Sequence, residues 1–193
     1  MLHDDEYENY CNVMDKLKQR AQAGEQPHRK LHRLSMYAYT ASDCHFFFTV
    51  CACDRARNPF LNKELAEGII KSLLWTKQRY EWTLYGYCLM PDHLHFLARL
   101  PERGIELFDA GARGIVPKGI LDHVGNFKKF TTTQLWWKLG GSGDLWQKSS
   151  YDRAILFNRS VEPALRYLLN NPVRRGLVDD WRDYPYTAVV DPS

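Results

Sequence analysis

Several features that would assign a protein to a compartment are missing from this sequence. No run approaches the roughly 18 to 20 apolar residues that a membrane-spanning helix needs. The polar, acidic start, MLHDDEYENY, lacks the apolar core of a signal peptide. The five cysteines are an odd number without a CxxC pair, which argues against a disulfide framework and favours free thiols. We therefore expect a cytoplasmic protein with no membrane partner.

A large excess of positive charge is missing as well. The 26 Lys and Arg residues exceed the 23 Asp and Glu residues by so little that the net charge is +3. Any binding of nucleic acid must therefore depend on local basic patches. What the sequence does contain, 45% hydrophobic and 25% charged residues, is typical of a globular protein and excludes disordered, collagen-like and coiled-coil chains. The length of 193 residues suits one well-packed domain.

The hydrophobic pattern predicts an alternation of strands and helices. We expect strands at 45–53, 82–90, 93–100 and 150–157, and helices at 63–80 and 120–138. A third helix begins after Ser160, and Pro172 is expected to stop it. Residues 101–117 are expected to form a loop. Residues 1–43 form a partly flexible N-terminal extension, which leaves 44–193 as the main domain.

The first six elements follow the order βαββαβ, which is typical of an α+β, ferredoxin-like split βαβ fold. We expect one antiparallel sheet with helices on one face. The two long helices would cover that face, and the other face would be available for a ligand or for dimer contacts.

One predicted strand carries two histidines with alternating spacing. His93 and His95, in MPDHLHFL, project from the same face because successive side chains of a strand point to opposite faces. Two imidazoles on one face can bind a divalent cation or a phosphate. The spacing also arises by chance, and two histidines need a third ligand from elsewhere.

The third helix carries a tyrosine and an asparagine four residues apart. Tyr167 and Asn171, in LRYLLNNP, share one helix face. A phenol can act as a nucleophile and an amide oxygen as a metal ligand. The alternative is that Tyr167 is a core aromatic residue and Asn171 caps the helix end.

Taken together, MPDHLHFL, LWQKSSYDRAI and LRYLLNNPVRRGLV, followed by DDWRDYPYT, resemble the REP-associated tyrosine transposases. These are HUH single-stranded DNA endonucleases with one catalytic tyrosine. The resemblance extends over about residues 45–187. It implies a ferredoxin-like fold, a divalent metal (Mg²⁺ or Mn²⁺) held by His93 and His95 with Asn171 as third ligand, and Tyr167 as the nucleophile.

The implied reaction is nicking and joining of single-stranded, hairpin-forming DNA through a 5′-phosphotyrosine intermediate. The alternative is a catalytically silent protein that binds DNA hairpins or regulates through them. A metal-binding domain unrelated to DNA is a third reading, which explains neither the tyrosine helix nor the basic loops. The sequence leaves open whether the protein is a monomer or a homodimer.

Candidate DNA contacts are the basic residues of loops and helix ends and one glutamine: Arg55, Arg57, Lys128, Lys129, Gln147, Arg174 and Arg175. Aromatic side chains can also stack on unpaired bases. The candidates for stacking are Trp136, Trp137, Trp146, Tyr151 and Trp181, and packing in the core is the alternative for each.

Overall fold

A computed structural model describes residues 44–101, 107–109, 115–117, 119–156 and 159–191. The predicted N-terminal extension lies outside the described residues. Contacts divide the chain into two units, and the larger one covers residues 42–104 and 120–193. It contains a five-stranded antiparallel sheet with the order β6-β1-β3-β2-β7. In the described part of the chain, no helix is both long and apolar enough to cross a membrane.

The central strands match the hydrophobic runs of the sequence. The three central strands are β1 (Cys44–Cys51), β2 (Thr83–Met90) and β3 (His93–Arg99), and the edge strand β6 (Tyr151–Leu156) matches a predicted strand as well. β3 lies between β1 and β2, and these two strands run in the same direction because each is antiparallel to β3. The predicted α+β fold with an antiparallel, split βαβ sheet is thus confirmed.

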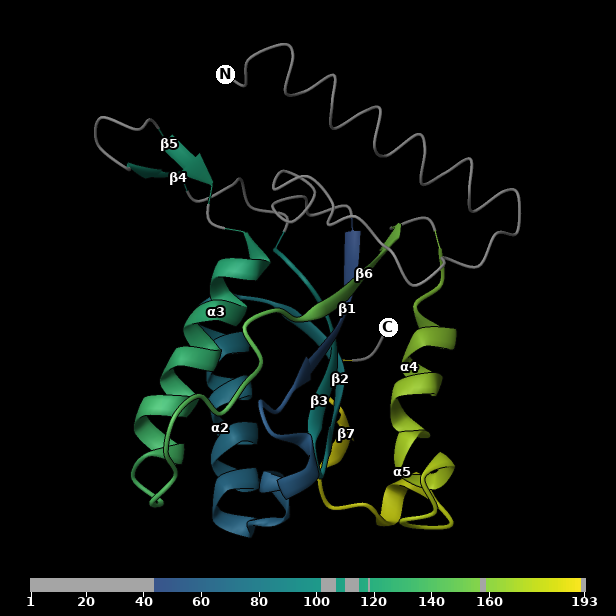
Figure 1. Cartoon of the computed structure of the whole chain (residues 1–193). Coiled ribbons are helices and arrows are strands. Elements are labelled where there is room, and N and C mark those ends of the chain that lie inside the picture. Colours follow the sequence, from purple (N-terminus) through teal and green to yellow (C-terminus); the bar gives the residue numbers. More distant parts are fainter. Residues whose placement is uncertain (1–43, 102–106, 110–114, 118, 157–158, 192–193) are drawn as a thin grey trace. The chain divides into compact units, whose positions relative to one another are not determined.

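Two long helices cover one face of this sheet (Figure 1). α2 (Lys63–Arg79) begins where the Asn62 side chain accepts a hydrogen bond from the Leu65 N–H and so caps the helix. α3 (Ile120–Thr131) continues into a π-helical turn, η5 (Thr132–Trp136), within the predicted helix 120–138. On this face, Phe96 of β3 stacks between Phe48 and Trp82.

The opposite face carries α4 (Glu162–Leu169) and α5 (Asn171–Arg174), so the face expected to be open is largely covered by the C-terminal helices (Figure 1). Leu165 and Leu168 of α4 pack on Phe47, Cys88 and Leu97 of the sheet. Gly86 permits this close packing, because a Cβ atom there would lie 2.7 Å from Leu165 and 2.8 Å from the Ala188 carbonyl oxygen.

Several details differ from the sequence-based expectations. Pro172 does not stop the helical region but lies in the first turn of α5, where a missing N–H costs nothing. Residues 101–117 are not all loop, because β4 (Leu107–Asp109) pairs with β5 (Ile115–Pro117) in the second unit. The edge strand β7 (Thr187–Val189) was not predicted.

Short helical turns complete the larger unit: η2 (Arg55–Arg57), η3 (Pro59–Leu61) and η6 (Trp181–Asp183). The four cysteines that the structure describes are all free thiols, as expected, and Cys44 and Cys88 are buried.

Candidate active site

The turn between β2 and β3 places two histidines side by side on the face covered by α4. His93 and His95 are 5% and 6% exposed, and their Nε2 atoms lie 3.0 Å apart. Leu94 and Phe96 are buried on the opposite side of the strand, as the alternation predicts. The predicted placement of both imidazoles on one face of the strand is therefore confirmed.

The other ring nitrogen of each histidine has a partner of its own. His93 Nδ1 lies 2.6 Å from Oδ1 of Asp92, and His95 Nδ1 lies 2.9 Å from the Thr49 hydroxyl. Arg55 donates from Nε to Oδ2 of Asp92 at 2.7 Å. With their Nδ1 atoms held in this way, both histidines direct Nε2 toward each other.

Burial keeps these histidines neutral. It lowers the pKa of His95 to about 3, with a further contribution from the neighbouring His93. Burial also lowers the pKa of His93, although the Asp92 carboxylate opposes that shift. For Asp92, burial would raise the pKa, but hydrogen bonds from His93 and Arg55 outweigh it and hold the pKa below its ordinary value. The result is a pair of neutral imidazoles beside an ionised carboxylate.

The tyrosine and asparagine come from the junction of α4 and α5. Tyr167 is 49% exposed, and its ring lies 6.0 Å from that of Phe47, which in turn lies 5.3 Å from the ring of His95. Asn171 is 8% exposed and donates from Nδ2 to the carbonyl oxygens of Tyr167, at 2.9 Å, and Leu168, at 3.2 Å. Although α4 ends at Leu169, Tyr167 and Asn171 still line the same pocket.

These hydrogen bonds fix the orientation of the Asn171 amide. A carbonyl oxygen only accepts hydrogen bonds, so the amide atom that faces Tyr167 and Leu168 must be the nitrogen. The amide oxygen is therefore the atom of Asn171 that remains to serve as a ligand.

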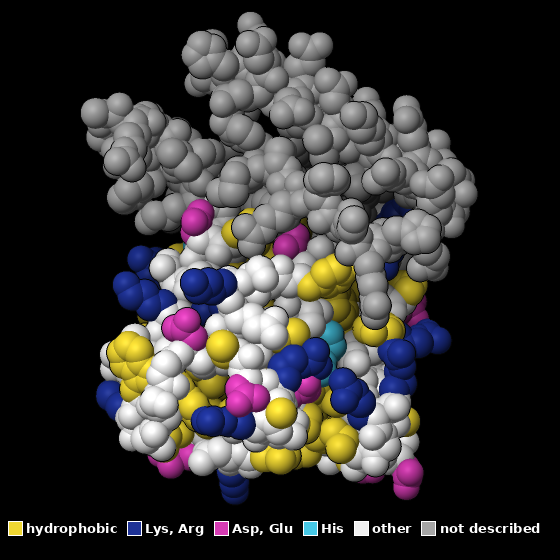
Figure 2. All heavy atoms as spheres, in the orientation of Figure 1, with side chains coloured by type: hydrophobic (Ala, Val, Ile, Leu, Met, Phe, Trp, Pro, Cys, Tyr) yellow, Lys and Arg dark blue, Asp and Glu magenta, His cyan; other side chains and the backbone are white. Residues whose placement is uncertain are grey.

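One pocket of about 290 Å³ unites most of these side chains, and we call it the histidine pocket. Its walls come from strands β1 and β3, from the segment after β1, and from helices α4 and α5. The residues that line it are Thr49, Cys51, Arg55, His93, His95, Tyr167, Asn171, Arg174 and Arg175. Figure 2 shows a histidine at the surface with Lys and Arg side chains beside it.

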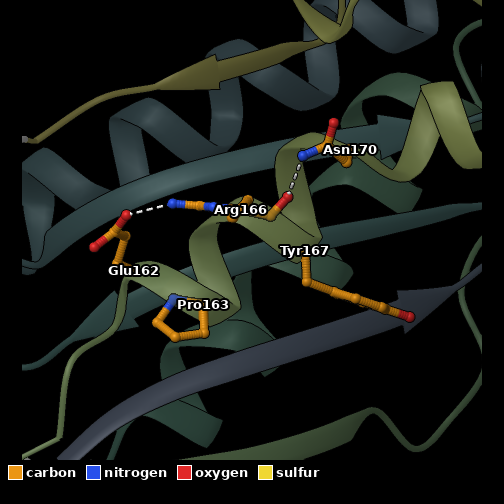
Figure 3. A pocket seen from close by; sticks show the side chains of 5 residues that line it. All are labelled: Glu162, Pro163, Arg166, Tyr167 and Asn170. Atoms are coloured by element: carbon orange, nitrogen blue, oxygen red, sulfur yellow. Dashed lines mark hydrogen bonds and ion pairs between the residues drawn. The ribbon is translucent and has the colours of Figure 1, made fainter.

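Tyr167 also borders a second hollow, which Glu162, Pro163, Arg166 and Asn170 line (Figure 3). Arg166 and Glu162 form an exposed ion pair at 2.6 Å, and their side chains extend away from that of Tyr167. The phenol thus stands apart from the other polar groups of this hollow.

The donors of the histidine pocket fit a divalent cation. Two nitrogens 3.0 Å apart match adjacent ligands at about 90° around an ion with bonds of about 2.1 Å. Among the described residues, no group of three His, Cys, Asp or Glu side chains is arranged to hold a metal. Within this part of the chain, a third protein ligand would be of another kind, and Asn171, which carries an amide oxygen, lines the same pocket.

The predicted DNA contacts divide into two groups. Arg55, Arg174 and Arg175 line the histidine pocket and give it a positive character. The others lie outside its lining. Arg57 forms an ion pair with Asp54 at 3.0 Å, and the backbone N–H of Gln147 donates a hydrogen bond to the Cys51 carbonyl oxygen. Lys128 donates to the carbonyl oxygens of Gln147 and Lys148, whereas Lys129 is exposed at the end of α3.

The aromatic candidates for stacking also divide. Trp146 is 3% exposed, packs on Phe60 and donates to the Thr131 hydroxyl, so it is a core residue. Trp137 and Tyr151 are each 51% exposed. Trp136 and Trp181 are partly buried.

Two residues that line the pocket, Thr49 and Cys51, were not singled out from the sequence, and neither was Asp92, which contacts His93 and Arg55. The strand period places Thr49 and Cys51 on one face of β1. Only the register shows that they lie opposite His95 and His93. Asp92 lies in the turn between β2 and β3, and nothing in the sequence pattern marks its contact with His93.

Comparison with known proteins shows the family of the chain. The model of the family described as "Transposase IS200 like" matches residues 40–170, about two thirds of the chain. A protein of Haemophilus influenzae named as a REP-associated tyrosine transposase is 24% identical over 149 residues, which cover 74% of this chain and 78% of the relative.

A solved structure of a REP-associated tyrosine transposase bound to a REP hairpin has a similar fold. Its TM-score is 0.54, at 22% sequence identity, and the match covers 82% of this chain and 81% of the other. The resemblance to REP-associated tyrosine transposases is confirmed by these matches. Since the family model spans well over half of the sequence, the chain belongs to the family of IS200-like transposases.

Proposed function

We propose that this protein is a metal-dependent enzyme that cleaves and rejoins single-stranded DNA next to a hairpin, with Tyr167 as the nucleophile. The observation that carries the proposal is the histidine pocket, in which Tyr167, His93, His95 and Asn171 are gathered beside three arginines. The solved structure bound to a REP hairpin supports a DNA hairpin as the partner.

The pocket suits a phosphodiester of DNA. Arg174 and Arg175 border it, and a phosphate group would find their guanidinium groups beside the phenol of Tyr167. Tyr167 is exposed enough for an extended strand to reach it. A bound divalent cation, Mg²⁺ or Mn²⁺, held by His93, His95 and Asn171, would polarise the scissile phosphate.

In the proposed reaction, the phenol oxygen of Tyr167 attacks the phosphorus atom in line. An O–P bond to the tyrosine forms, the P–O3′ bond breaks, the phenol gives up its proton, and the departing 3′ oxygen takes up a proton. Rejoining is the reverse reaction, in which a 3′-hydroxyl attacks the phosphotyrosine. Because the covalent bond conserves the energy of the phosphodiester, no nucleotide cofactor is required.

The test uses end-labelled hairpin DNA with single-stranded flanks, incubated with the full chain and Mn²⁺ or Mg²⁺. We expect a covalent adduct on a denaturing gel that Tyr167→Phe abolishes. Tyr151→Phe is the matched control, since Tyr151 is equally exposed but lies on β6. The double variant His93→Ala with His95→Ala should lose cleavage while it retains most of the hairpin affinity measured by fluorescence anisotropy.

Two outcomes would contradict the proposal. An adduct in Tyr167→Phe would assign the nucleophile elsewhere. Tight hairpin binding by the wild type without any adduct, over a broad set of hairpins, would favour the alternative of a catalytically silent hairpin-binding or regulatory protein.

A further inference from the structure

The carboxylate of Asp92 lies between two side chains at the rim of the histidine pocket. Its Oδ1 lies 2.6 Å from His93 Nδ1, and its Oδ2 lies 2.7 Å from Arg55 Nε and 2.5 Å from Arg55 Nη2. The side chain of Asp92 is 11% exposed and that of His93 is 6% exposed. All three groups are thus held in one chain of hydrogen bonds.

An ionised carboxylate only accepts hydrogen bonds. His93 Nδ1 must therefore carry the proton, and in the neutral ring the lone pair is on Nε2. That is the atom 3.0 Å from His95 Nε2.

We propose that Asp92, clamped by Arg55, is a positioning residue that fixes His93 in the tautomer whose Nε2 can bind the cation. This inference rests on the metal site of the proposed function. It also gives Arg55 a role beyond a direct contact with DNA, because its guanidinium selects which oxygen of Asp92 is left to face His93.

The hydrogen-bond partners of His95 are uncharged, since its Nδ1 faces the hydroxyl of Thr49, which can donate or accept. In the metal-free protein, His95 Nε2 donates to the lone pair of His93 Nε2. When a cation takes both Nε2 lone pairs, the proton of His95 can move to Nδ1 and face the Thr49 oxygen. The two histidines are unequal, and the orientation of His93 should matter more than that of His95.

The variant Asp92→Asn tests the tautomer specifically. Arg55 has only donors, so it should hold the amide oxygen of the new side chain and leave the amide nitrogen facing His93 Nδ1. His93 Nδ1 would then have to accept, and its proton would move to Nε2. This nearly isosteric change should be more harmful than Asp92→Ala, which leaves His93 free to choose its tautomer.

The first measurement needs no metal. The full-length protein is first treated with a chelator to remove metal ions. Nitrogen-15 NMR of its histidine rings should then show His93 protonated on Nδ1 in the wild type and on Nε2 in Asp92→Asn. The matched control is Asp54→Asn, because Asp54 pairs with a neighbouring arginine, Arg57, and asparagine caps η2 equally well.

The second measurement is the Mn²⁺ dissociation constant from calorimetry, with urea unfolding to show that each variant is folded. Asp92→Asn should bind Mn²⁺ roughly 10- to 100-fold more weakly than the wild type. Asp92→Ala should lose less. Adding Arg55→Ala to Asp92→Asn should restore part of the affinity, because the amide can then turn its oxygen toward His93.

An unchanged His93 tautomer in Asp92→Asn would overturn the inference, as would equal losses of affinity in Asp92→Asn and Asp92→Ala. If instead the wild type binds no Mn²⁺ at His93 and His95, the metal site of the proposed function fails, while the NMR result still decides the tautomer.

Discussion

The guanidinium carbon of Arg174 lies 4.6 Å from the centre of the Tyr167 ring, at the rim of the histidine pocket. A cation over an aromatic face is attracted by the ring, by about 0.5 to 2 kcal/mol depending on exposure. The contact therefore holds the proposed nucleophile beside a positive charge.

Arg174→Ala should slow formation of the covalent adduct by about tenfold, which corresponds to about 1.4 kcal/mol in the barrier. The measurement is the single-turnover rate with hairpin DNA. Arg166→Ala is the matched control, because Arg166 is the sequence neighbour of Tyr167 on α4 but pairs with Glu162 and extends away from Tyr167 (Figure 3). Equal slowing in both variants would show that the effect is one of general charge.

Asn171→Ala should lower the free energy of unfolding by about 1 to 3 kcal/mol, because it removes the two hydrogen bonds that the buried amide donates to the carbonyl oxygens of Tyr167 and Leu168. Urea unfolding measures this. Asn170→Ala removes a similar bond, to the Arg166 carbonyl oxygen, at an exposed site and should cost within about 0.5 kcal/mol. Similar losses in the two variants would contradict the structural role assigned to Asn171.

Two neighbouring lysines on α3 should behave differently. Lys128→Met should reduce stability by about 1 kcal/mol, because Lys128 anchors the carbonyl oxygens of residues 147 and 148. Lys129→Met should change the free energy of unfolding by no more than about 0.5 kcal/mol. If Lys129 contacts a phosphate, this variant should release about one counterion fewer on binding DNA, which lowers the salt dependence of the affinity. Urea unfolding and anisotropy titrations over a range of salt concentrations separate the two effects. An unchanged stability of Lys128→Met would refute the anchoring role.

In the metal-free protein, the free energy of unfolding should decrease as the pH falls from 7.5 to 5. His95 has a pKa of about 3 when folded against 6.5 as its ordinary value, so below pH 6.5 the unfolded chain binds a proton that the folded chain does not. At pH 5 the loss from His95 is about 2 kcal/mol. The lowered pKa of Asp92 acts only at lower pH. Burial lowers the pKa of His93 and of His45 as well, and both act in the same direction. His95→Gln should therefore reduce the pH dependence without abolishing it, and an unchanged slope in that variant would contradict the assignment.

The sequence carried enough local information to predict the core of the fold. Asn62 caps α2 through its own side chain, and the alternation of His93 and His95 is a property of one strand. The three-residue strand β7 has too few residues for a hydrophobic period, and it forms because it pairs with β2. Pro172 was ambiguous, since proline is compatible both with the end of one helix and with the first turn of the next.

The residues of the site that lie in local motifs were predictable from the sequence, and their long-range partners were not. Its four proposed catalytic residues lie in two local motifs, and the structure brings these motifs to one pocket. The partners Thr49 and Asp92 depend on the register of β1 against β3 and on the side-chain geometry of a turn. Neither is encoded in a spacing along the chain.

The proposed nucleophile is tested most directly by identifying the residue that becomes attached to DNA. The adduct formed with hairpin DNA is digested with protease and nuclease, and the modified peptide is sequenced by mass spectrometry. We expect a nucleotide bound to Tyr167 through its 5′-phosphate, and none on any other tyrosine. A nucleotide on a different residue would contradict the assignment of Tyr167 as the nucleophile.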